Sequence, residues 1–297
     1  MAVLIDPPRW PAHGTRFAHL VSDATLDELF EFADAAQVPS RAFDHDHYDV
    51  PERRYADLVS SGAEPVDEKT LLRRLKDSGL RVRPRDRTPH AAQVLPALRQ
   101  AWAELLPSQV ALGEELLERW QEPNRHYHDV RHLAQALGAL AELDQAGSRT
   151  ARLALWFHDA VYTGTAGADE EASAELAVFS LTKVGLPAAT VDEVARLILL
   201  TITHTTDAGD DRGALVLDAD LSVLGTAPGR YHVYARDVRL EYSQFSDTEF
   251  ASGRLRVLDR LLNLEELYRT PAAKSRWLAS ARANLASEHR RWARVAA

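Results

Sequence analysis

The chain has 297 residues, of which 45% are hydrophobic and 27% are charged, and its formal net charge is -9. This length and composition predict two globular domains rather than one. The acidic balance argues against an extensive nucleic-acid-binding surface, because such a surface needs many Lys and Arg side chains against phosphates. Cysteine is absent, which excludes disulfides, thiolate metal sites and a cysteine nucleophile. Any metal site must therefore use His, Asp and Glu.

The N-terminus and the overall hydropathy predict a cytoplasmic protein. The opening run MAVLIDPPRW lacks the charged and apolar regions of a signal peptide, and no apolar run is long enough to span a membrane. We therefore expect no membrane partner. A small phosphorylated substrate is compatible with the net charge, because it needs only a local cationic pocket. The sequence does not indicate an oligomeric state.

Residues 1–82 predict a small α/β domain. A strand-like run at 3–5 is followed by helical periodicity at 25–36, 51–61 and 67–79. The segment 43–49, FDHDHYD, is expected to be a loop because it is rich in Asp and His. Apolar periodicity then disappears, and prolines punctuate the segment 83–96, which we interpret as a solvated linker.

Residues 97–297 predict an all-helical domain. Nearly every segment after Pro96 has apolar residues at helical spacing, and none is typical of a strand. A capping box at Thr190 and Glu193 and glycines at 185 and 225 mark helix ends. Short connections favour a compact bundle. The predicted helices are 97–106, 108–120, 124–142, 150–162, 169–184, 190–204, 213–224, 229–243, 247–268 and 272–295.

Histidine and aspartate side chains stand at informative places in these helices. His128 and His132 lie one turn apart, opposite the apolar stripe of the 124–142 helix, and this spacing can bring two imidazoles to one metal ion. Two exposed or hydrogen-bonded histidines would give the same pattern. His158 and Asp159 lie inside an apolar helix, where an ionised carboxylate is costly unless a cation or strong donors compensate it.

A second apolar helix, 213–224, contains Asp218 and Asp220. Two residues apart on a helix, the two side chains point in nearly opposite directions. Only one of them is expected to face the same centre as the histidines. The other is expected to cap a helix or to pair locally.

These residues resemble the ligands of the HD superfamily of metal-dependent phosphohydrolases, and the resemblance covers positions 95–295. The superfamily's ligand order is a His, then a His-Asp pair, then a distant Asp. In this chain the order is given by His132, His158, Asp159 and Asp220. Asp220 is selected over its neighbour because the second Asp of an Asp-Ala-Asp block is usually the ligand in that superfamily.

Longer blocks resemble one uncharacterised bacterial branch of predicted phosphohydrolases. In that branch an Asn stands where this chain has Asp169. The blocks are RHYH at 125–128, WFHDAVY at 156–162, DEEASA at 169–174 and LDADLSVLG at 217–225.

The resemblance implies an activity, a cofactor and residue roles. It implies hydrolysis of a phosphate ester, with nucleotides as the expected substrates, by water activated on one or two divalent ions such as Mn, Mg or Fe. By position, His128 would protonate the leaving group, as the corresponding His does in related cyclic-nucleotide phosphodiesterases. Asp159 could bridge two ions.

Further candidates surround this predicted centre. A second metal ion or the phosphate could be bound by His204, Glu170 or Asp218, although the dipoles of helix ends also explain the first two. Arg239 and Arg254 could clamp a phosphate bidentately. Salt bridges to Glu241 or Asp259 are the alternative interpretation of these two arginines.

Two other functions fit the same ligand order. Some HD-type domains use this core with additional ligands as di-iron oxygenases, which predicts bound iron and oxygen consumption. A non-catalytic sensor would bind metal or nucleotide without turnover.

The first 80 residues resemble a second bacterial domain, of unknown function, through AVLIDPPRWP at 2–11 and HYDVP at 47–51. The candidates there are Asp6, Arg9, Trp10 and His13, which suit recognition of an anion or an aromatic group. Alternatively, Trp10 packs in the core, and His45 and His47 decorate a polar turn. The resemblance itself supplies no function.

Overall fold

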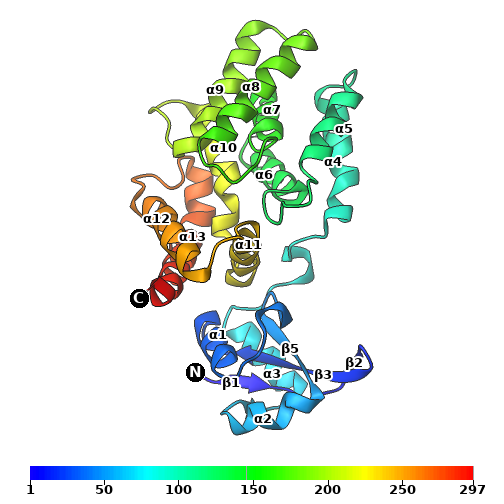
Figure 1. Ribbon diagram of the computed structural model, residues 1–297, viewed down its shortest axis with the longest axis vertical. Coiled ribbons are helices and arrows are strands. Elements are labelled where there is room, and N and C mark those ends of the chain that lie inside the picture. The colour runs from blue at the N-terminus through cyan, green and yellow to red at the C-terminus, as the bar shows by residue number, and fades with distance from the viewer. Residues whose placement is uncertain (145, 297) are drawn as a thin grey trace. The chain divides into compact units, whose positions relative to one another are not determined.

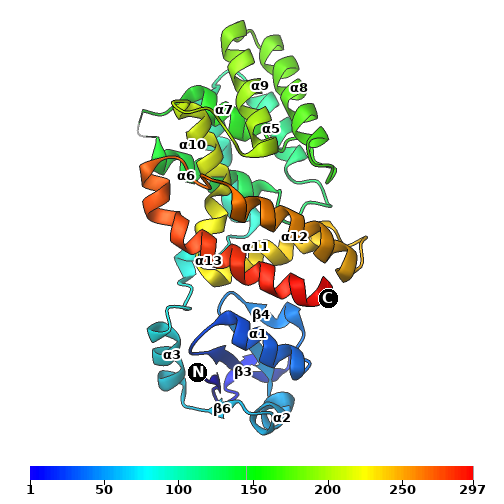
Figure 2. The same cartoon turned by 90° about the vertical axis from the view of Figure 1, so that its left-hand side faces the viewer.

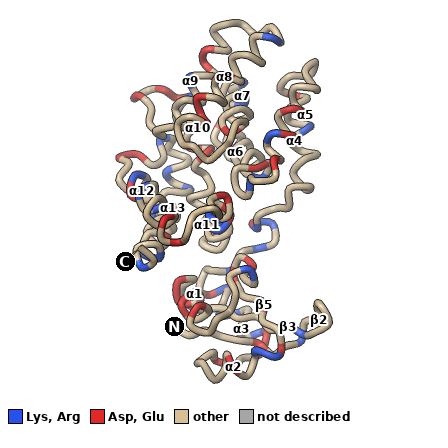
Figure 3. The backbone as a smooth tube through the Cα atoms, viewed as in Figure 1, with Lys and Arg blue, Asp and Glu red and all other residues tan. Residues whose placement is uncertain are grey.

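The computed structural model describes residues 1–144 and 146–296 (Figure 1). The chain divides into two compact units, Met1–Arg87 with Ala227–Val233, and Thr88–Thr226 with Tyr234–Ala297. The protein is mainly helical with a small α/β region at its N-terminus, and this confirms the coarse fold prediction. None of the described helices is both long and apolar enough to cross a membrane. Figure 3 shows basic residues interspersed with acidic ones along both units.

The first unit is built on a six-stranded sheet with the order β4-β5-β3-β1-β6, and β2 pairs with β3 (Figures 1 and 2). β1 runs antiparallel to β3 and parallel to β6. The helices α1 and α3 pack against β3, and their leucines complete the hydrophobic core. The strands are β1 (Val3–Ile5), β2 (Trp10–Ala12), β3 (Thr15–Ser22), β4 (Phe43–Asp44), β5 (His47–Pro51) and β6 (Glu64–Pro65); the helices are α1 (Leu26–Ala35), α2 (Tyr55–Ser60) and α3 (Glu68–Asp77).

The predicted loop at 43–49 is wrong, because this segment forms the hairpin β4–β5. Phe43 and Tyr48 are buried, and the polar residues between and beside them are compensated by partners. Asp46 accepts hydrogen bonds from Arg81 and from the backbone N–H of Val82. The prediction failed because composition alone does not show that such polar groups are paired.

The predicted linker 83–96 is shorter than expected. The first unit ends at Arg87, and α4 (Ala91–Leu105) begins inside the predicted linker. The helix starts there because Gln93 accepts the backbone N–H of His90 at 2.8 Å, as in a capping box. Pro96 is accommodated within this helix although it cannot donate a backbone hydrogen bond.

The second unit is helical, and no strand occurs in its described residues 88–144, 146–226 and 234–296. α6, α7, α9 and α10 pack on one another, α8 lies along α9, and α12 lies along α13 (Figure 1). The elements are α4, α5 (Val110–Arg119), α6 (Val130–Leu143), α7 (Arg149–Phe157), α8 (Ala168–Lys183), α9 (Ala188–Thr203), α10 (Asp211–Asp220), the 3-10 helix η4 (Leu221–Gly225), the part of α11 (Pro228–Glu241) that follows Val233, α12 (Asp247–Asn263) and α13 (Pro271–Ala296).

Two helix ends differ from the prediction at functionally important places. α6 begins only at Val130, because Asp129 is its N-cap and accepts the backbone N–H of Arg131. His128 therefore precedes the helix rather than lying one turn before His132 on it. α7 ends at Phe157, so His158 and the following Asp lie just beyond its last turn.

Arg125 explains why α7 can end in an apolar environment. Its buried guanidinium donates to the backbone carbonyls of Asp159 and Ala160, at 2.6 and 3.2 Å. In a longer helix, backbone N–H groups would have donated to these carbonyls. Here the charged guanidinium donates to them instead.

The predicted capping signals had mixed outcomes. Gly185 adopts φ of 81° just after α8, as predicted. Gly225 is the last residue of the 3-10 helix η4, and glycine is required there because a side chain would overlap Trp277. The capping box at Thr190 is wrong, because α9 already begins at Ala188 and Glu193 pairs with Arg196.

Candidate metal centre

Four side chains converge where α6, the end of α7 and the end of α10 meet. The Nε2 atoms of His132 and His158 lie 3.1 Å apart, and both rings are buried. Asp159 Oδ2 lies 3.6 Å from the first Nε2 and 3.2 Å from the second. Asp220 Oδ1 lies 3.1 and 3.4 Å from the same two atoms. The structure therefore brings the four predicted ligands together.

Hydrogen bonds at the opposite ring nitrogens orient both imidazoles. His158 Nδ1 donates to the backbone carbonyl of Leu155 at 2.9 Å. His132 Nδ1 lies 3.0 Å from the hydroxyl of Tyr127. With the proton of the neutral ring on Nδ1, each Nε2 presents its lone pair to the centre, and such outer partners are typical of metal-ligating histidines.

The electrostatics of the cluster favour positive charge at its centre. Burial alone would raise the pKa of Asp159, but the charge and hydrogen bond of His158 hold that pKa below its usual range. The pKa of Asp220 is lowered in the same way, through His132 and His158. Burial opposes the charged form of His158, yet the two carboxylates raise its pKa well above the usual value. A cation among these groups would satisfy all four.

Asp220 extends the cluster toward His204, whereas Asp218 leaves it. His204 follows α9 in a left-handed conformation, with φ of 53°, and its Nε2 lies 3.2 Å from Asp220 Oδ2. The family resemblance indicates Asp159 as the residue that could bridge two ions, whereas the aspartate that contacts a further possible ligand is Asp220. Asp218 is buried elsewhere, and it accepts the backbone N–H groups of Arg269 and Thr270 together with the Thr270 hydroxyl. It organises the start of α13.

His128 lies beside the cluster and is held by Glu241, a residue that the sequence reasoning considered only as a partner for an arginine. Glu241 Oε2 lies 2.7 Å from His128 Nδ1 and accepts the hydroxyl of Tyr162 at 3.0 Å. Its Oε1 accepts the backbone N–H groups of residues 126, 127 and 128, each at 2.8 Å.

This arrangement fixes the charges of the pair. Burial would raise the pKa of Glu241, but His128 and the backbone donors lower it to about 2. Burial also opposes charge on His128, but Glu241 raises the pKa of its ring. One sequence signal existed: Glu241 is the last residue of α11, where the helix dipole disfavours an acid, so a compensating partner could have been expected.

A cavity of about 440 Å³ opens over the cluster. Its polar lining residues include His128, Asp159, His204 and Asp220, and its aromatic lining residues include Tyr242, Phe245 and Phe250. Glu170 also lines it, while its carboxylate accepts the backbone N–H of Gly167 at the start of α8.

Both predicted phosphate-binding arginines are ion-paired, and Arg254 also lines the cavity. Arg239 contacts Asp247 at 2.9 Å, and Arg254 makes a buried ion pair with Glu288 at 2.8 Å. The ion pairs of the alternative interpretation are present, with Asp247 and Glu288 as partners in place of the expected Glu241 and Asp259.

The wall of the cavity carries two other arginines, Arg256 and Arg260 on α12. Both arginines are exposed to solvent and also line the cavity. Sequence reasoning missed them because nothing in their spacing separates them from ordinary surface arginines.

Two of the N-terminal candidates, Asp6 and Trp10, contact His19 in the first unit. Asp6 is buried at the end of β1 and contacts His19. Trp10 is 46% exposed, so its alternative placement in the core is wrong. Arg9 is exposed, and His13 occupies the β2–β3 turn with φ of 47°. His45 is in the β4–β5 turn, but His47 is buried on β5.

Comparison with known proteins identifies only the N-terminal region. Residues 3–78 match the family described as "Protein of unknown function (DUF4031)". This agrees with the predicted N-terminal domain of unknown function, and it does not bear on the helical unit. The chain matches no curated protein and no solved structure.

Proposed function

We propose that the helical unit is a metal-dependent phosphohydrolase of the HD type. The observation that carries this proposal is the convergence of His132, His158, Asp159 and Asp220 at the base of a cavity. Two imidazole nitrogens and two carboxylate oxygens are a ligand set that suits Mn²⁺, Fe²⁺ or Zn²⁺.

The residues present fit a divalent ion. Two Nε2 atoms only 3.1 Å apart cannot both carry lone pairs stably unless a proton or a cation lies between them and the carboxylates. When bound, a divalent ion would lower the pKa of a water molecule and polarise a phosphoryl oxygen.

The proton for the leaving oxygen comes from His128 in this proposal. Glu241 keeps that ring protonated and fixes its orientation through Nδ1, so that Nε2–H is the free donor. Tyr162 stacks on the ring, with centroids 4.4 Å apart, and restricts its rotation. The acid therefore has a defined direction beside the metal ligands.

The cavity suits a small phosphate ester with an apolar or aromatic part. Tyr242, Phe245 and Phe250 offer aromatic contacts, and Arg256 and Arg260 offer positive charge. This combination supports a nucleotide-like substrate.

A di-iron oxygenase is the second candidate, favoured by one observation. Asp220 contacts the His132–His158 pair through Oδ1 and His204 through Oδ2, and this is a way to join two ions. The oxygenase predicts oxygen consumption by the iron-loaded protein and no phosphate release.

The test measures phosphate release from a panel of nucleotides and small phosphate esters by the Mn²⁺-loaded full chain. His132→Ala should abolish release, because it removes one ligand. His289→Ala is the matched control, since this partly exposed histidine pairs with Asp259 on the surface, and it should leave release unchanged. Absence of release from every compound by metal-loaded wild type would contradict the proposal.

A further inference from the structure

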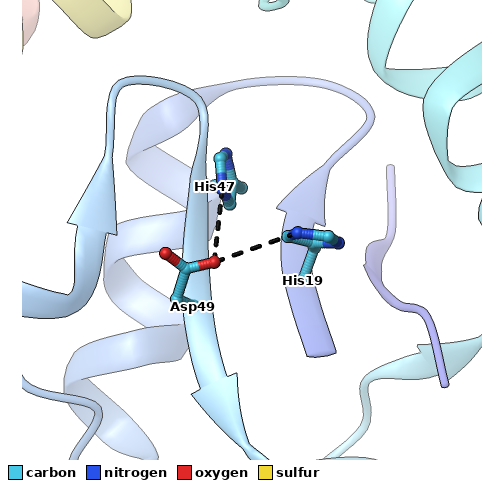
Figure 4. A group of neighbouring side chains, drawn as sticks. All are labelled: His19, His47 and Asp49. Carbon is cyan, nitrogen blue, oxygen red and sulfur yellow. Dashed lines mark ion pairs between the residues drawn. The ribbon is translucent and has the colours of Figure 1, made fainter. Parts of the chain in front are cut away.

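The sheet of the first unit places two histidines and an aspartate on one surface (Figure 4). β3 and β5 pair antiparallel, with His19 directly opposite Asp49. His47 precedes Asp49 by two residues on β5, so both side chains point to the same side of the sheet. Register alone therefore brings the three together.

Their possible ligand atoms lie close to one another. Asp49 Oδ1 lies 3.4 Å from His47 Nε2 and 3.9 Å from His19 Nε2, as Figure 4 shows by dashed lines. All three ligand atoms lie within 4.8 Å of one another. Ligands around a tetrahedral ion at about 2.1 Å are separated by roughly 3.4 Å, so only small side-chain movements would complete such a site.

A buried carboxylate holds the other nitrogen of each ring. Asp6 Oδ2 lies 2.9 Å from His19 Nδ1, and its Oδ1 accepts the His19 backbone N–H at 2.6 Å. Asp46 Oδ1 lies 2.7 Å from His47 Nδ1. Asp6 is 1% exposed and Asp46 is fully buried, so both acceptors are fixed by the fold.

These outer carboxylates point to a bound cation independently of the distances within the cluster. A carboxylate on Nδ1 leaves the Nε2 lone pair as the free donor, and carboxylate–histidine–metal arrangements use this same geometry. Two such lone pairs facing one carboxylate oxygen require a proton or a cation between them. Asp46 is itself anchored by Arg81 and by the backbone of Val82, so its orientation does not depend on the histidine.

We propose that His19, His47 and Asp49 bind one divalent transition-metal ion, with Zn²⁺ as the best fit. Three protein ligands leave a fourth position, and Asp49 is half-exposed, so solvent or an anionic ligand can reach that position. This site belongs to the first unit and does not depend on the proposed function of the helical unit.

The test counts Zn²⁺ ions bound per full-length chain after removal of free metal. Asp49→Ala should bind one ion fewer than wild type. Asp57→Ala is the matched control, an exposed aspartate of the same unit, and should equal wild type. Equal zinc content in Asp49→Ala and wild type would overturn the proposal. Loss of an ion from His132→Ala reports on the helical unit instead, so failures of the two proposals are distinguishable.

A second measurement needs no variant that could misfold. Adding Zn²⁺ to wild type labelled with ¹⁵N in histidine should shift the Nε2 resonances of His19 and His47 and leave their Nδ1 resonances nearly unchanged. Unchanged Nε2 resonances at excess Zn²⁺ would mean that a proton, and not a metal, occupies the space between these side chains.

Discussion

Glu241 holds His128 at two points: one carboxylate oxygen accepts its backbone N–H at 2.8 Å, and the other lies 2.7 Å from its Nδ1. The same carboxylate thus fixes the position of the backbone and the charge of the ring. Glu241 is the last residue of α11, and His128 precedes α6. The contact therefore joins two segments that are more than a hundred residues apart in the sequence.

Glu241→Gln should lower kcat for phosphate release by about 100-fold, because His128 would lose the charge that keeps it an acid. The metal content should stay at the wild-type value, since Glu241 contacts no proposed ligand atom. Glu118→Gln, on the exposed side of α5, is the control and should have no effect. A parallel loss of metal would reassign Glu241 and His128 to the metal site.

The same pair predicts a pH dependence of stability. The pKa of Glu241 is about 2 in the folded protein, below its ordinary value, so its contribution is complete above the unfolded pKa of about 4.5 and is lost as pH falls toward 2. In urea unfolding, wild type should exceed Glu241→Gln in stability at pH 6, by up to about 3 kcal/mol. This difference should shrink steadily between pH 5 and pH 3; a constant difference would contradict the ionic role.

The buried Arg254–Glu288 pair predicts a large effect on stability. Both side chains are buried, and Glu288→Gln should destabilise the chain by about 3–5 kcal/mol because it leaves an uncompensated guanidinium. Glu142→Gln breaks the exposed pair with Arg276 and should cost less than about 1 kcal/mol. Chemical denaturation of both variants compares the two costs. Similar values would mean that Arg254 reaches water.

Asp6→Asn tests the proposed zinc site through its outer partner. The variant should weaken Zn²⁺ binding by about 10–100-fold, because His19 would lose the carboxylate that orients its ring. Asp34→Asn, on the exposed side of α1, is the control. Calorimetric titration of the N-terminal site in a His132→Ala chain makes the measurement, and unchanged affinity would show that Asp6 serves only the fold.

The sequence predicted the helical unit better than the sheet. Helices with clear apolar periodicity, such as α8 and α9, were found to within a few residues, because packing enforces the same period. The hairpin β4–β5 was missed because His47 pairs with Asp44 across the hairpin and Asp49 pairs with His19 on β3, and periodicity does not show cross-strand partners.

The candidate site was predictable in its ligands and not in their surroundings. His158 and Asp159 stood out as polar groups in an apolar run, and Asp220 followed from family resemblance. The start of α6 was misplaced because Asp129 caps it, and the end of α7 was misplaced because Arg125 satisfies carbonyls 34 and 35 residues away in sequence. No local pattern reports a contact of that range, and the same applies to Glu241.

The neighbouring aspartates of α10 provide the most direct test of the central claim, that His132, His158, Asp159 and Asp220 hold the ion that hydrolysis requires. Asp220→Asn and Asp218→Asn change the same group two residues apart, and Mn²⁺ content and phosphate release would be measured on both. We predict that Asp220→Asn loses metal and release together, while folded Asp218→Asn keeps both at a lower unfolding midpoint. Retention of metal and release by Asp220→Asn would contradict the account.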